Sequence, residues 1–320
     1  MWLIMEPWVP MDAVTIVIPT LDRPAPLRRA LLSALTQQGL DDRQLEIVVV
    51  DNSRDGSARR TIDDLPEAPG RLIRYLSLPV PGVASARNAG VAAAGGRWIA
   101  FLDDDQEASP LWIASHLAVL RATGADAVFG PVEALPDGPG EIGGFAPYFS
   151  RTIDRPDAAD VTDLGAYLGT NNSMFERARC LDEAAPFDPT LDQTGGEDSL
   201  LIRRLVLSGR RFAFAASAHV IEWVPPRRLN WAYVRKRKFL SGQIRSFVNL
   251  KVSPARWGDT LIWMAVGAAQ FALAGVAAAA FAPFDRERSS RALASAYGGL
   301  GKLLWMPRFR PALYGSGHVS

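Results

Sequence analysis

The segment Arg97–Asp105, RWIAFLDDD, constrains the fold more than any other part of the chain. Its apolar run, WIAFL, predicts a buried strand, and three consecutive carboxylates follow where that strand ends. Ligands of open α/β sheets bind beyond the carboxyl ends of the strands. Adjacent anions repel one another, and hard oxygen ligands at this density suit Mg²⁺ or Mn²⁺, which can in turn hold a diphosphate. The alternative for Asp103, Asp104 and Asp105 is a solvated acidic loop.

Apolar runs on both sides of this segment alternate between strand and helix patterns. Strands are predicted at residues 14–18, 45–50, 72–76, 127–132 and 211–221, and helices at 28–38, 83–94, 110–122, 197–207 and 229–247. Strands that alternate with helices and are almost continuously hydrophobic indicate a mostly parallel sheet covered on both faces. The predicted fold is therefore α/β and Rossmann-like. Residues 136–163 are rich in Gly, Pro and Asp and are expected to form a long surface excursion.

Composition excludes several classes of protein. With 48% hydrophobic and 22% charged residues, the 320-residue chain is expected to form a packed core. A net charge of +1 argues against a dedicated nucleic-acid binder. Cys180 is the only cysteine, so no intrachain disulfide can form and a reducing compartment is expected. The first ten residues lack a basic region and contain prolines, which predicts no secretory signal; Met11 is a second candidate start.

Polar residues follow several predicted strands and converge on one edge of the sheet, which predicts a pocket there. They are the segment PTLDRP, Asp51 and the segment GVASARNAG. No GxGxxG follows the first strand, which disfavours a dinucleotide cofactor, and no GxxxxGK[ST] occurs.

Five segments resemble, in order, the motifs of family 2 glycosyltransferases with the GT-A fold. They are VTIVIPTLDRP, EIVVVDNSRDGS, GVASARNAGVAAAGGRWIAFLDDD, TNNSMFERA and GGEDSLLIRRL, and the resemblance extends from about Val14 to Gly242. It implies a metal-dependent, inverting enzyme that uses Mn²⁺ or Mg²⁺ and a nucleotide-diphosphate sugar, most often UDP-linked. The sugar would pass to a hydroxyl acceptor in polysaccharide or cell-envelope glycan synthesis.

The resemblance assigns roles to individual residues. On the donor side, Pro19, Thr20 and Asp22 of the first loop would contact the nucleotide, and Asp51 would accept a hydrogen bond from its base. Arg87 and Asn88 would lie near the nucleotide base and the phosphates. Asp103 and Asp104, which follow the apolar strand, would complete the donor side. Asp105 would be the direct metal ligand, with Asp103 near the ribose and metal. The stretch Thr170, Asn171 and Asn172 would line the acceptor side; its alternative is a simple Asn-rich turn.

A pair of acids follows two glycines where a helix is predicted to begin. Glu197 and Asp198 sit well at the positive end of the helix dipole, which by itself describes an ordinary helix start. By resemblance the pair supplies the catalytic base that deprotonates the acceptor, with Asp198 preferred and Glu197 the alternative. A further metal ligand, commonly His in the family, would be Glu222 or His219; on one strand the two would point to opposite faces.

The chain is expected to divide into a leader (1–13), a catalytic domain (14–226) and a helical C-terminal region (227–320). Within the domain, about 14–135 would bind the nucleotide-sugar and 136–226 would form the acceptor and catalytic half. Residues 261–284 carry no formal charge and are long enough to cross a bilayer, yet they are rich in Ala and Gly. Basic residues on both sides favour a re-entrant hairpin or a surface-lying pair with the stretch 291–306 over a simple span. The alternative is a soluble helix packed on the domain or on a partner.

These features predict attachment to the cytoplasmic face of the cell membrane, peripheral, re-entrant or single-span, where a lipid-linked glycan would be the acceptor. Two other functions stay open at this point. A nucleotidyltransferase would need a Gly-rich, Lys-bearing loop after the first strand, and PTLDRP is not one. A non-catalytic, membrane-associated scaffold that keeps the fold is the other.

Overall fold

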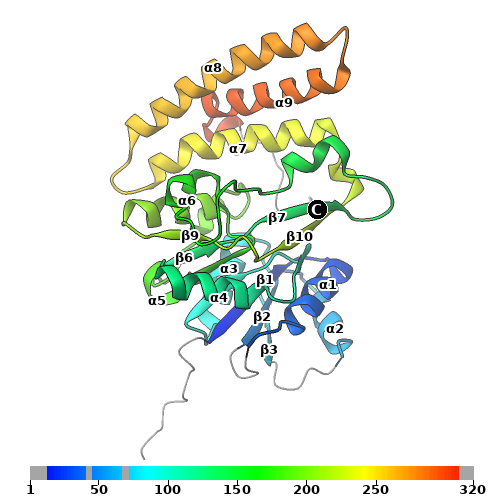
Figure 1. Cartoon of the computed structure of the whole chain (residues 1–320), viewed down its shortest axis with the longest axis vertical. Coiled ribbons are helices and arrows are strands. Elements are labelled where there is room, and N and C mark those ends of the chain that lie inside the picture. Colours follow the sequence, from blue (N-terminus) through cyan, green and yellow to red (C-terminus); the bar gives the residue numbers. More distant parts are fainter. Residues whose placement is uncertain (1–12, 41–44, 67–71, 310–320) are drawn as a thin grey trace, which may run out of the picture.

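The structure, a computed structural model, describes residues 13–40, 45–66 and 72–309. Almost all of the predicted leader, 1–13, and the last part of the predicted C-terminal region lie outside these residues. Figure 1 shows an α/β domain with a layer of three long helices on one side of it. These helices are α7 (Trp231–Lys251), α8 (Trp257–Phe281) and α9 (Arg286–Leu303).

The main sheet has the strand order β3-β2-β1-β4-β8-β6-β9 in the described part of the chain. Its strands are β1 (Val14–Thr20), β2 (Leu45–Asp51), β3 (Leu72–Ser77), β4 (Trp98–Phe101), β6 (Ala127–Phe129), β8 (Ser173–Glu176) and β9 (Phe212–Phe214). Only β8 runs against the others, pairing antiparallel with both β4 and β6. The sheet is therefore mostly parallel, as predicted, and the buried residues of β1, β2 and β4 form its core.

Helices cover this sheet on both faces. They are α1 (Pro24–Leu35), α2 (Ser57–Asp63), α3 (Val83–Ala93), α4 (Trp112–Thr123), the short α5 (Arg177–Cys180) and α6 (Glu197–Leu207). Helix α1 begins earlier than predicted because Pro24 occupies its first position, where the missing N–H costs nothing. Helix α6 has the predicted bounds.

Two predicted strands are each divided between two sheets. Residues 127–132 form β6 and the start of β7 (Val132–Pro136), and residues 211–221 form β9 and the start of β10 (Val220–Val224). The break in the first lies at Gly130, where an added Cβ would come within 2.3 Å of the Ala218 carbonyl oxygen. The second sheet has the order β5-β10-β7, with β5 at Gln106–Ala108. It brings Glu222 opposite Gln106, directly after the acidic segment.

The excursion at 136–163 is packed rather than loose. Its 3-10 turn, η2 (Gly143–Tyr148), sets Phe145 and Tyr148 against Trp231 of α7, with ring centroids 5.0 and 5.7 Å apart. A second 3-10 turn, η3 (Thr162–Tyr167), lies beside α6. The excursion therefore joins the α/β domain to the helical layer.

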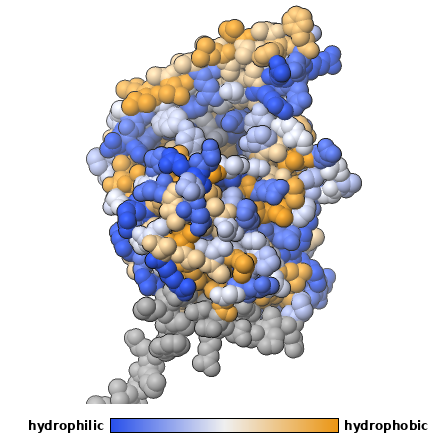
Figure 2. Space-filling model, viewed as in Figure 1, coloured by the Kyte–Doolittle hydropathy of each residue, from blue (hydrophilic) through white to orange (hydrophobic). Residues whose placement is uncertain are grey.

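Helix α8 is the outermost helix of the layer (Figure 1), and it packs against α9 and α7. Its central polar residue, Gln270, faces α9: it donates to the Ser295 carbonyl oxygen at 2.8 Å and accepts from Lys302 Nζ at 2.6 Å. Gly267 and Gly299 let the two backbones approach closely. Figure 2 shows apolar side chains gathered along this outer edge of the molecule.

In the described residues, α8 is the one helix long and apolar enough to cross a membrane, and only 11% of its most apolar window is buried. In this structure it lies along the helical layer, beside α9 (Figure 1).

Candidate active site

A cleft of about 490 Å³ lies at the carboxyl ends of β1 and β4, between α3, α6 and α7. This volume is in the range that small-molecule ligands occupy. The predicted site residues that line it are Pro19, Thr20, Arg87, Asp103, Asp104, Asp105, Asn171, Glu197, Asp198 and Glu222. Both predicted halves of the domain therefore contribute to one space.

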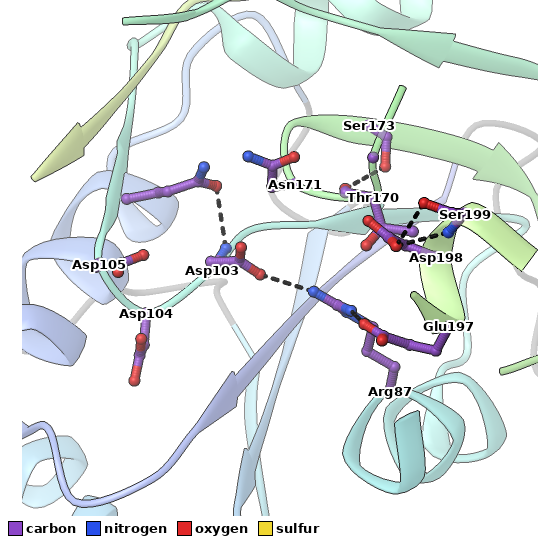
Figure 3. Close-up of polar contacts among 12 residues, drawn as sticks. Arg87, Asp103, Asp104, Asp105, Thr170, Asn171, Ser173, Glu197, Asp198 and Ser199 are labelled. Carbon is purple, nitrogen blue, oxygen red and sulfur yellow. Dashed lines mark hydrogen bonds and ion pairs between the residues drawn. The ribbon is translucent and has the colours of Figure 1, made fainter. Parts of the chain in front are cut away.

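The three aspartates after β4 point in different directions (Figure 3), and Asp104 and Asp105 share one partner, Arg23. Asp103 pairs with Arg87 at 3.1 Å. Asp104 accepts from the Thr20 hydroxyl at 2.8 Å and pairs with Arg23 at 2.5 Å. Burial raises the pKa of Asp103 and raises that of Asp104 to about 6, although the arginines act in the opposite direction. Asp104 and Asp105 are buried, and all three carboxylates form ion pairs with arginines, so the segment is not a solvated acidic loop.

Asp105 has two arginine partners, Arg23 at 3.3 Å and Arg228 at 3.4 Å. The sequence analysis assigns no role to either arginine: Arg23 stands inside the segment PTLDRP, and Arg228 directly precedes the helix predicted at 229–247. Both line the cleft. A guanidinium is a strong ligand for phosphate oxygens, so these two side chains could bind a phosphate group beside the carboxylates.

The carboxylates of the cleft fit a divalent cation that arrives with its phosphate ligand. Among the described residues, no group of three or more His, Cys, Asp or Glu could by itself hold a metal ion. Burial and the neighbouring Asp105 raise the pKa of Glu222 to about 7, with Asp103 adding to the effect. Such crowding of negative charge is relieved by a cation, and Mg²⁺ usually binds through one or two carboxylates plus substrate phosphates.

Of the two candidates for the further metal ligand, the structure brings only Glu222 into the cleft. Glu222 is buried in β10, whereas His219 precedes that strand and is exposed. The strand register explains the difference, since Glu222 pairs with Gln106 next to the acidic segment.

Glu197 and Asp198, the two acids predicted to supply the catalytic base, lie at the start of α6. Gly195 and Gly196 adopt positive φ values of 70° and 95°, and a Cβ on Gly196 would lie 3.1 Å from Ile244 and Phe247 of α7. This turn aims Glu197 and Asp198 at the cleft from the positive end of the helix.

The two acids differ in environment. Glu197 is buried and its Oε1 pairs with Arg87 at 2.5 Å, while its Oε2 has no hydrogen-bond partner among the described residues. Burial and the neighbouring Asp198 raise the pKa of Glu197 to about 7. Asp198 lines the cleft and accepts through Oδ1 from the Ser199 backbone N–H at 2.6 Å. Figure 3 shows Asp198 across the cleft from Asp103, with Arg87 between Asp103 and Glu197.

Five predicted donor- or acceptor-side residues do not line the cleft. Asp51 is fully buried, and its carboxylate accepts from Ser53, Ala58 and Tyr75, so it holds its own loop. Asn88 makes a two-way bridge to the Phe187 backbone at 2.7 and 3.0 Å. Thr170 is fully buried. Asp22, at φ 53°, is absent from the lining, where its neighbours Leu21 and Arg23 appear.

Asn172, the fifth, is also structural. Its Oδ1 accepts from Trp112 Nε1 at 2.7 Å and contacts His116 Nε2 at 3.0 Å, while its amide donates to the Pro131 and Ala218 carbonyl oxygens. Of the stretch 170–172, only Asn171 reaches the cleft.

Arg151 holds that stretch in place and was missed in the sequence. Its buried guanidinium donates to carbonyl oxygens of Gly130, Gly169, Asn171 and Asn172, and to Asn171 Oδ1 at 2.9 Å. Burial lowers its pKa to about 10, while Asp198 and Glu222 act to raise it. Arg151 lies in the excursion that shows no periodicity, so no local pattern distinguished it from a surface arginine.

Solved structures share this fold. Over 91% of this chain, S. aureus TarS in complex with UDP superposes with a TM-score of 0.54 at 16% identity, covering 90% of that chain. Mannosyltransferase PcManGT from Pyrobaculum calidifontis, in complex with GDP-Man and Mn²⁺, gives 0.59 at 18% identity, over 91% of this chain and 87% of its own. At these identities the likeness concerns the fold, which is that of GT-A glycosyltransferases.

Sequence relatives define the family. Residues 15–175 match Glycosyl transferase family 2. Succinoglycan biosynthesis protein ExoM of Rhizobium meliloti (strain 1021) is 33% identical over 66% of this chain and 68% of its own length. Glycosyltransferase AglE of Haloferax volcanii is 24% identical over 79% of this chain and 80% of its own. The chain belongs to glycosyl transferase family 2. It is a glycosyltransferase, which decides against the nucleotidyltransferase and scaffold hypotheses.

Proposed function

We propose that this glycosyltransferase moves a sugar from a nucleotide-diphosphate sugar, with UDP as the first candidate, to a hydroxyl of a growing polysaccharide, inverting the anomeric centre. The observation that supports it most is the shared cleft, in which the acidic segment after β4 faces Asp198 at the start of α6. The names of ExoM and of Succinoglycan biosynthesis protein ExoO support polysaccharide synthesis. The bound UDP and GDP-Man of the structural neighbours support a nucleotide-sugar donor.

On the donor side, Pro19 and Thr20 would contact the nucleotide, while Arg23 and Arg228 would bind the diphosphate. Asp105, Asp103 and Glu222 would hold Mn²⁺ or Mg²⁺ together with oxygens of the diphosphate, since these side chains do not form a metal site by themselves. When bound, this cation supplies positive charge that stabilises the diphosphate leaving group. Asp104 is already satisfied by Thr20 and Arg23, so we assign it to ordering the loop.

On the acceptor side, Asp198 would take the proton of the acceptor hydroxyl. The hydroxyl oxygen then forms a bond to the anomeric carbon as the bond between that carbon and the diphosphate oxygen breaks, and the electron pair leaves with the diphosphate. Glu197 is occupied by Arg87 and would position that arginine between donor and acceptor. Asn171, held by Arg151, would contact the acceptor sugar.

Replacing Asp198 by Asn tests the base directly. Since a positioned base contributes typically 10²–10⁴-fold, we expect kcat for sugar transfer to fall by about that factor while UDP affinity, measured by calorimetry, is retained. Asp182→Asn, an exposed acid that lines neither this cleft nor any other described pocket, is the matched control. Unchanged transfer in Asp198→Asn would remove Asp198 from the mechanism.

We also propose that the enzyme works at the cytoplasmic face of the cell membrane, attached peripherally through α8. The support is the exposed apolar side of that helix, with Leu261, Leu273 and Val276 exposed by 60, 73 and 71%. A helix lying in the interface, with its polar residue turned to the protein, fits this attachment better than a single span.

A further inference from the structure

A second pocket, of about 290 Å³, lies between α6, α7, α8 and η3. It is next to the active-site cleft, because Ser199 and Ile244 line both. Ser199 directly follows the proposed base. Figure 1 shows α6 and the α7–α8 connection at the same end of the helical layer, which is where this pocket is found.

The walls of the pocket are largely apolar. They include Val206 of α6, Val248 of α7, and Ile262 and Trp263 of α8. Ile262 is 63% exposed and belongs to the apolar outer side of α8. The pocket therefore shares a wall with the catalytic cleft on one side and borders an exposed apolar surface on the other, which is an arrangement suited to a long apolar chain.

The charges around the pocket leave one arginine without an anionic partner. Asp259 is neutralised by Arg203, and Asp163 pairs with Arg155 at 2.9 Å. Arg245 forms no ion pair with any residue that the structure describes; it lies over the ring of Tyr167, which borders the cleft, at 4.5 Å and over that of Trp263 at 6.0 Å. Arg245 is half-buried, and Asp198, whose charge acts on it, forms no ion pair with it, so an anion from a ligand would complete its partners.

We infer that this second pocket binds the lipid part of the acceptor, an amphiphile with a phosphate head group at Arg245 and an apolar chain against Val206, Val248 and Ile262. This inference rests on the proposed function, since it names the acceptor class of the same site. The sugar to be extended would lie at Asp198, on the cleft side of Ser199. The chain would leave past α8 toward the membrane surface.

Calorimetric titration of the whole chain with farnesyl phosphate, in the presence of UDP, tests the inference. Wild-type protein is expected to bind. Ile262→Glu places a charge against the apolar chain and Arg245→Gln removes the phosphate partner, so each should weaken binding by about tenfold or more. Ile262 is largely exposed, so its variant is expected to fold and to keep its affinity for UDP. Matched controls are Leu273→Glu on the same helix, 73% exposed, and Lys236→Gln on α7; neither should change binding.

Three results would overturn the inference. Wild-type protein that binds UDP but not farnesyl phosphate would remove the lipid pocket and leave the proposed function in place. Protein that binds neither would contradict both. Equal binding of dihexanoyl phosphatidic acid, equally sensitive to Ile262→Glu, would show a pocket for bilayer lipid rather than for the acceptor.

Discussion

Glu197 and Asp198 are neighbours in sequence with different physical states. Both line the cleft, but helix geometry turns the Glu197 carboxylate toward Arg87, where it is buried, and leaves Asp198 more exposed. The sequence predicted the pair and its position at a helix start, yet not this division. The division depends on Arg87, which lies 110 residues earlier in the chain.

Glu197 makes the stability of the ligand-free protein depend on pH. Its pKa rises from the ordinary 4.5 to about 7 on folding, mainly through burial. Between these values the folded state keeps a proton that the unfolded state has lost, so the free energy of unfolding falls as pH rises through the window, by about 1 to 3 kcal/mol in total. Urea denaturation across the window should show a smaller decrease in Glu197→Gln and the full one in Glu183→Gln, an exposed control. Identical pH slopes would contradict the assigned state of Glu197.

The further metal ligand gives a second prediction at this scale. Glu222→Gln should weaken Mn²⁺-dependent UDP binding by at least about tenfold, because it removes a charge from the carboxylate group of the cleft. His219→Gln should leave it unchanged, since His219 is exposed outside the cleft. Calorimetry with and without Mn²⁺ measures both, and the opposite ranking would favour His219.

At the scale of elements, the predictable parts are those with local signals. Hydrophobic periodicity located the strands of the parallel sheet, and the double glycine located the start of α6. The split of residues 127–132 and 211–221 between two sheets was not predictable, because the close contact of Gly130 with Ala218 joins segments 88 residues apart and leaves no periodic mark. Asp51 and Asn172 belong to the segments that resemble the family's motifs, but neither lines the cleft. Their side chains instead form hydrogen bonds within the protein, which the sequence does not reveal.

The loop before β8 is held by a single guanidinium, that of Arg151, and replacing this residue tests how much the loop depends on it. Arg151→Met leaves several buried carbonyl oxygens without donors, and we expect the free energy of unfolding to fall by about 3 kcal/mol. The KM for the acceptor should rise while UDP affinity changes little. Arg155→Met removes only an exposed pair and should cost less than about 1 kcal/mol. Equal effects of both variants in urea denaturation and acceptor titration would show that Arg151 has no special role.

For the whole molecule, the outer side of α8 is the proposed membrane contact. Leu273→Glu combined with Val276→Glu should strongly reduce co-sedimentation with vesicles containing anionic lipid, because both side chains are exposed and apolar burial would drive the contact. Leu72→Glu, on the exposed edge strand β3, is the control and should bind vesicles as the wild type does. Unchanged co-sedimentation of the double variant would leave α8 without a membrane role.

The antiparallel strand β8 has a consequence for how such an enzyme could be re-engineered. It comes from the half of the domain predicted to bind the acceptor, 136–226, yet it lies between β4 and β6 and hydrogen-bonds to both. A cut near residue 135 would leave the first half with a gap in its sheet and the second half with a strand lacking neighbours. The two halves are therefore not exchangeable modules, and a chimaera with altered acceptor choice has to replace loops such as 136–163 within one continuous sheet.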